Sequence, residues 1–149
     1  MPDYEYAKGR VTESVQFISE EMREFENDYA AKSWQDYRDD KKLQKLIDRT
    51  VENILTALIE VCGAVLVEEG IAVGSYGEAL KKCSKLFNLS AGEQERLSRL
   101  ALQRNRLAHR YLNYRWQAIE IFKKEKDLLI NLINAILQRE EERAKQPTK

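Results

Sequence analysis

Apolar side chains recur every three or four residues along most of the chain, which is the spacing that lines one face of an α-helix. The first run of this kind covers residues 11–29, and the longest covers residues 43–66 and ends before Gly70. Glycine at such a place can adopt the left-handed conformation that often follows a helix end. Shorter runs cover residues 79–87 and 97–108, and the last covers residues 116–139. The pattern predicts a helix over each segment and no strand, with residues 30–42 as the one longer connection.

Two serine and glutamate pairs mark where helices begin. Ser75 is followed three residues later by Glu78, and Ser90 by Glu93. In a capping box, the hydroxyl and the carboxylate of such a pair satisfy free amides of the first helical turn. The pairs therefore predict the starts of the two shorter helices.

The distribution of proline agrees with a helical chain. The only prolines are Pro2 and Pro147, so no proline ring interrupts a helix between them. The predicted fold class is all-α, an antiparallel bundle of four to five helices, with residues 1–149 as a single domain. The charged residues after Glu140 are expected to fray.

Composition excludes several classes of protein. With 149 residues, 43% of them hydrophobic, the chain is long enough to bury a core without disulfides. Its cysteines, Cys62 and Cys83, form no CxxC pair and there is one histidine, so a zinc site is not expected. Residues 1–10 are too polar for a signal peptide, and the most apolar window, residues 53–67, is interrupted by Glu60. We expect a cytoplasmic protein with no membrane span.

Charge is distributed unevenly although the formal net charge is zero. Residues 1–40 hold eleven acids and five bases, whereas residues 96–119 hold six arginines and no acid. Tyr111, Tyr114 and Trp116 stand among these arginines. Arginine binds phosphate through two parallel hydrogen bonds and aromatic rings stack on unpaired bases, so this composition suits single-stranded RNA. On charge alone, a solvated surface or a patch that pairs with the acidic N-terminal helix is the more common explanation.

A short motif within the basic segment adds specific chemistry. Arg104 is followed by Asn105, by the only histidine, His109, and by Tyr111. This arrangement resembles the R-x4-6-H-x-Y signature of HEPN-domain proteins, in particular the HepT-like toxins. The resemblance covers nearly the whole chain, because that family is also all-helical, has about this length and carries its motif before a final long helix. It implies a ribonuclease.

The residue types explain how such an enzyme would work. His109 can take a proton from a ribose 2′-hydroxyl or give one to the leaving 5′-oxygen, and Arg104 can offset the charge that builds on the phosphate. On a regular helix Asn105 and His109 share one face, so Asn105 is expected to orient His109. Arg106 and Arg110 are candidates for contacts with the RNA backbone. No metal and no cofactor is expected.

The resemblance also implies partners. HEPN proteins form dimers whose motifs face each other across a shared cleft, which would supply the second histidine that acid and base catalysis needs. A minimal nucleotidyltransferase (MNT) antitoxin modifies the tyrosine that corresponds to Tyr111 with AMP. The chain is thus expected to be a homodimeric, metal-independent ribonuclease, the toxin of a type VII toxin–antitoxin pair, that leaves a 2′,3′-cyclic phosphate and a 5′-hydroxyl.

Two alternatives remain open at this point. The chain could be a non-enzymatic helical subunit that presents a substrate or nucleotide to a separate nucleotidyltransferase. It could also be a helical scaffold in which the motif is a coincidence. The first shares its fold and partner with the toxin, so the sequence separates the two poorly.

Overall fold

The computed structural model describes residues 10–145, and this range contains helices and no strand. The expectations for residues 1–9 and 146–149 lie outside the described residues. In chain order the elements are α1 (Val11–Glu24), the π-helical turn η2 (Phe25–Tyr29), α2 (Trp34–Asp39), α3 (Lys41–Glu68), α4 (Tyr76–Leu86), α5 (Ala91–Ser98), α6 (Leu100–Arg106) and α7 (Leu112–Lys145). The predicted all-α fold is confirmed.

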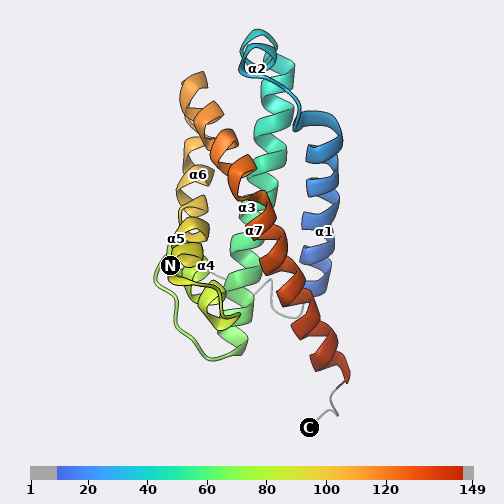
Figure 1. Ribbon diagram of the computed structural model, residues 1–149, viewed down its shortest axis with the longest axis vertical. Helices are drawn as coiled ribbons and strands as arrows, with labels where there is room; N and C mark the ends of the chain where they lie inside the picture. Colours follow the sequence, from blue (N-terminus) through green and yellow to red (C-terminus); the bar gives the residue numbers. More distant parts are fainter. Residues whose placement is uncertain (1–9, 146–149) are drawn as a thin grey trace.

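The elements form a bundle around α3 (Figure 1). Helix α1 packs against α3 and runs in the opposite direction, while α4 packs against α3 on another side. Helix α7 crosses α3, and its first half lies beside α6. The short α2 lies near the end of the bundle where α3 begins. This arrangement brings the end of α6 and the start of α7 next to the first half of α3.

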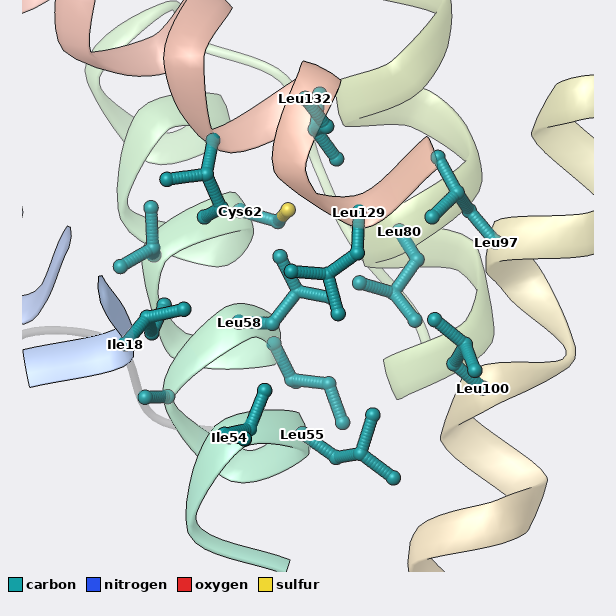
Figure 2. Close-up of a cluster of buried hydrophobic side chains, with 14 of the residues drawn as sticks. Ile18, Ile54, Leu55, Leu58, Cys62, Leu80, Leu97, Leu100, Leu129 and Leu132 are labelled. Atoms are coloured by element: carbon teal, nitrogen blue, oxygen red, sulfur yellow. The ribbon is translucent and has the colours of Figure 1, made fainter. Parts of the chain in front are cut away.

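Leucines from five helices form the part of the core that holds α6 in place. Figure 2 shows side chains from α3, α4, α5, α6 and α7 that point toward one another. They are fully buried, and the labelled leucines include one from each of these helices, Leu58, Leu80, Leu97, Leu100 and Leu129. Burying one such side chain contributes about 1.5–3 kcal/mol, so together they fix the position of the short α6.

The two cysteines are part of the same core. Cys62 of α3 and Cys83 of α4 are both free and buried. The neighbouring Cys83 thiol, together with burial, raises the pKa of Cys62. The thiolate is the reactive form of cysteine, and the raised pKa keeps Cys62 as the thiol, so this buried side chain serves to pack the core.

Three predicted helix ends have the expected chemistry. Gly70 adopts a φ of 73°, which confirms the left-handed residue after α3. At α5, Ser90 and Glu93 form a complete capping box. At α4, the Ser75 hydroxyl accepts the Glu78 N–H as predicted, but the Glu78 carboxylate accepts the N–H of Gly74 instead of that of Ser75.

Some predicted boundaries were wrong. The connection over residues 30–42 contains α2, whose start is capped by a Ser33 and Asp36 box that the apolar pattern did not reveal. Helix α7 starts before residue 116 and continues beyond Glu140, where fraying was expected. Its last turns are held to the end of α3, because both Arg139 and Arg143 pair with Glu68.

Helix α3 is long and apolar enough by composition to cross a membrane, with a mean hydropathy of 1.7 over its best window. However, 72% of that window is buried inside the bundle. Such burial is that of a core helix.

Candidate active site at the junction of α6 and α7

The motif lies across a break between two helices. Arg104, Asn105 and Arg106 form the end of α6, whereas His109 and Arg110 lie in the connection to α7. The break begins where the backbone hydrogen bonds change from a spacing of four residues to one of three, since the N–H of His109 donates to the carbonyl of Arg106 at 3.0 Å. The expectation of one regular helix through Asn105 and His109 was therefore wrong. Within residues 10–145, no hydrogen bond joins these two side chains.

The His109 ring explains why the chain turns here. The backbone N–H of Tyr111 donates to Nδ1 of His109 at 3.3 Å. This local bond satisfies an amide just before α7 and competes with continuation of α6. In the neutral imidazole it also selects the tautomer that carries its proton on Nε2. The side chain is exposed, so Nε2 is accessible as a donor.

Three aromatic rings gather at this turn. The centroid of the His109 ring lies 4.7 Å from that of Tyr111 and 4.9 Å from that of Tyr114. Both tyrosines are large exposed side chains. The Tyr111 hydroxyl accepts a hydrogen bond from Arg110 Nη2 at 3.4 Å, and the Arg110 guanidinium lies 5.3 Å from the centroid of the same ring. The structure thus brings His109, Arg110 and Tyr111 together.

Arg104 is held from two other helices. Its Nε–H donates to Thr56 Oγ1 on α3 at 2.7 Å, and its guanidinium carbon lies 5.5 Å from the ring centroid of Tyr76, the first residue of α4. The hydrogen bonds and ion pairs of residues 10–145 use neither Nη1 nor Nη2 of this side chain. With Nε engaged, the terminal edge of this guanidinium is the one that can bind two phosphate oxygens in parallel.

Among the other arginines of the basic segment, Arg96 and Arg115 form ion pairs, whereas Arg106 bonds to an uncharged side chain. Arg96 forms a bidentate pair with the buried Glu125 of α7, and Arg115 pairs with Asp48 of α3 at 2.7 Å. One expected alternative was that the segment pairs with the acidic N-terminal helix, but the acids in these two ion pairs lie on α7 and α3. Arg106 is half-buried, and its Nη1 donates to Gln103 Oε1 at 3.4 Å.

Sequence reasoning missed a buried polar group that anchors the start of α7. Asp48 accepts both the Arg115 bond and a bond from the Tyr37 hydroxyl, each at 2.7 Å. Burial raises the pKa of Asp48 despite these two bonds, and burial together with Asp48 raises the pKa of Tyr37. Trp116 stacks against Tyr37 with centroids 5.1 Å apart. The capping box of α2 was the available signal, because it would have revealed the helix that carries Tyr37.

No group of three or more histidine, cysteine, aspartate or glutamate side chains within residues 10–145 is placed to hold a metal ion. The chemistry available at the junction is that of an arginine whose terminal edge has no partner in this range, an exposed imidazole and exposed phenols.

The motif that resembles the HEPN signature thus has Arg104 at the end of α6 and His109 in the connection that follows. The family model described as Ribonuclease HepT-like matches residues 18–136, a range that includes the whole motif, and the chain belongs to this family. Searches of curated proteins and of solved structures returned no match.

Proposed function

We propose that the protein is a metal-independent endoribonuclease in which Arg104 and His109 act at the scissile phosphate. The observation that carries the proposal is the state of Arg104, whose Nε is fixed by Thr56 while neither terminal nitrogen has a hydrogen-bond or ion-pair partner among residues 10–145. A guanidinium held in this way is preorganised for the charge that develops on phosphate oxygens. Membership in the HepT-like ribonuclease family supports RNA as the substrate.

The reaction is an internal transfer at phosphorus. The ribose 2′-oxygen attacks the adjacent phosphorus as its proton passes to a base, and the bond to the 5′-oxygen breaks as that oxygen gains a proton. The products are a 2′,3′-cyclic phosphate and a 5′-hydroxyl. In the tautomer that carries its proton on Nε2, neutral His109 can donate a hydrogen bond to a phosphate oxygen, whereas transfer of a proton to the leaving oxygen requires the imidazolium, in which Nδ1 is protonated and the bond from the Tyr111 N–H is lost.

The second proton transfer calls for a second group. Each chain has one histidine, so we propose a homodimer in which the junctions of two copies face each other and share one cleft. His109, Tyr111 and Tyr114 are exposed in the single chain, which leaves them free to line such a cleft. We place this enzyme in the cytoplasm.

We further propose that the chain is the toxin of a type VII pair, silenced by an MNT antitoxin at Tyr111. The Tyr111 oxygen would attack the α-phosphorus of ATP, lose its proton to the antitoxin and release pyrophosphate. The phenol is accessible, with 49% of the residue exposed. The AMP adduct on Tyr111, two residues from His109, would set a negative charge beside Arg110, where the substrate phosphate has to approach.

The test is cleavage of mixed transfer and messenger RNA in EDTA by the purified full chain and its variants. His109→Ala should lower the rate roughly 10²–10⁴-fold, the usual contribution of a proton-transfer group. Arg104→Lys keeps the charge but loses the planar guanidinium, so it should also lose most of the activity. Cyclic-phosphate ends should appear with the parent protein alone.

Absence of cleavage by well-folded protein with unmodified Tyr111 would contradict the nuclease and favour the non-enzymatic subunit of a nucleotidyltransferase. Light scattering at micromolar concentration tests the dimer, which a mass of 17.4 kDa would exclude. Co-expression with a neighbouring nucleotidyltransferase gene tests the modification. Tyr111→Phe should abolish the added adenylyl mass, whereas Tyr114→Phe, at an equally exposed phenol, should not.

A further inference from the structure

A row of cations lies on the exposed side of the first half of α3. Lys42, Lys45 and Arg49, which we call the basic stripe, are all exposed. At 100° per residue they lie within about 40° of Thr56 around the helix axis, so all four positions share one face. The stripe and Thr56 together extend over about 21 Å of helix.

The stripe ends at the candidate active site. Thr56 is the residue whose hydroxyl accepts the Nε–H of Arg104 at 2.7 Å. An anionic chain that follows the stripe along α3 therefore arrives at the terminal nitrogens of Arg104, which have no partner in the described part of the chain. The two features come from different parts of the sequence and meet through this one bond.

A surface groove connects the same face of α3 with the motif. It has a volume of about 500 Å³, and Lys45, Arg49 and Leu107 are among its lining residues. Leu107 directly follows α6, between Arg104 and His109. The groove therefore lies between the stripe and the junction of α6 and α7.

The fold does not account for the charges of the stripe. Within residues 10–145 none of its three members forms an ion pair, whereas Arg96, Arg115 and Arg139 all do. The first turn of α3 carries Lys41 and Lys42 and no acid, although the positive end of a helix dipole disfavours cations there. These charges are thus available to an external anion.

We propose that the basic stripe binds the sugar–phosphate backbone of single-stranded RNA next to the phosphate held by Arg104. The proposal rests on the proposed ribonuclease function and extends it to a binding path outside the motif. Evenly spaced cations that lead to a free guanidinium match a polyphosphate chain, which carries a negative charge at every nucleotide. Two acids also line the groove: Asp48 is neutralised by Arg115, and Glu52 has no ion-pair partner among the described residues, so it opposes the RNA.

The experiment measures binding of a labelled single-stranded RNA oligonucleotide to the full chain over a range of salt concentrations. His109→Ala is present in every sample, so that the RNA stays intact. Lys45→Gln with Arg49→Gln should weaken binding several-fold and reduce the slope of log affinity against log salt by about 0.7 for each cation removed. Glu52→Gln should have the opposite effect and tighten binding.

The matched control is Arg23→Gln with Lys85→Gln, which removes the same charge from exposed positions on α1 and α4. It should leave the affinity and the salt slope close to those of the parent. Equal losses in the control and stripe variants would overturn the proposal, because they would reflect net charge alone. A stripe variant that changes the mass by light scattering but not the RNA affinity would overturn it as well, in favour of a contact between copies of the chain.

The result also separates this inference from the nuclease. If the parent chain with His109 intact cleaves RNA and the stripe variants bind and cleave normally, the stripe proposal fails and the nuclease stands. If RNA binding depends on the stripe but no cleavage occurs, the nuclease fails and the stripe stands. A chain that binds no single-stranded RNA at all overturns both.

Discussion

Arg104 of α6 and Thr56 of α3 are 48 residues apart in the sequence and are joined by a 2.7 Å hydrogen bond. The bond uses Nε, and the terminal edge of the guanidinium has no partner from residues 10 to 145. It also gives a core helix a direct contact with the residue proposed to bind the scissile phosphate. This relationship makes the orientation of Arg104, and not merely its charge, open to test.

Thr56→Val should slow RNA cleavage by about tenfold, because a hydrogen bond to a charged group contributes about 1.5–3 kcal/mol and part of it holds the productive geometry. Valine has nearly the shape of threonine, so the fall in the urea midpoint should reflect the lost bond and not a loss of packing. The measurement is kcat and KM on one RNA substrate. Thr56→Ser retains the hydroxyl and should restore the rate, and equal rates for the valine and parent proteins would show that the bond does not matter for catalysis.

The ring of Tyr76 gives Arg104 its second support. An exposed cation–π contact contributes about 0.5–1 kcal/mol, so Tyr76→Leu should reduce kcat only a few-fold. Tyr76→Phe keeps the ring and should behave like the parent in the same cleavage assay. A larger loss in the phenylalanine variant than in the leucine variant would contradict a role for the ring and point to the hydroxyl.

The sequence predicted those parts of the site that depend on neighbouring residues, and not the contacts between residues far apart in the chain. The R-x4-H-x-Y spacing predicts Arg104, His109 and Tyr111 as site residues, and the structure gathers His109 and Tyr111 at one turn. The supports of Arg104 were not predictable, because Thr56 and Tyr76 lie far away in the sequence and neither belongs to a local pattern.

The same limit explains the errors in the helices. Apolar spacing found the long α3 and its end at Gly70, since both are local features. It extended the motif helix through residue 108, because the bond from the Tyr111 amide to the His109 ring leaves no trace in the apolar pattern. It also treated Arg96 and Arg115 as part of an RNA surface, although each pairs with an acid on another helix, the buried Glu125 and the partly buried Asp48.

Asp48 should be the most costly of the anchoring residues to remove. Asp48→Ala leaves the Tyr37 hydroxyl and the Arg115 guanidinium without their shared acceptor in a mostly buried position, where breaking such a pair costs about 3 kcal/mol. Tyr37→Phe removes one neutral donor and should cost only about 1 kcal/mol. Urea unfolding followed by circular dichroism measures both. Similar losses in the two variants would mean that the ion pair contributes little.

The capping box at the start of α5 should make stability depend on pH. The Glu93 carboxylate accepts the backbone N–H of Ser90 at 2.9 Å, and this bond is the main cause that lowers the pKa of Glu93. A carboxyl group with a lowered pKa in the folded state stabilises the protein above its unfolded pKa of about 4.3, and that contribution is lost as the pH falls through the folded value. The gap in urea midpoint between the parent and Glu93→Gln should therefore be open at pH near 7 and close in acid.

Ser90→Ala is the matched variant for this prediction, because it removes the other half of the same box. The Ser90 hydroxyl accepts the Glu93 N–H at 3.1 Å and does not titrate, so the loss of about 1 kcal/mol expected for an N-cap serine should persist in acid. Urea midpoints measured between about pH 7 and pH 3 would distinguish the two variants, since these limits bracket the reference pKa of glutamate. A gap for Glu93→Gln that stays constant over this range would show that the carboxylate charge is not what stabilises the start of α5.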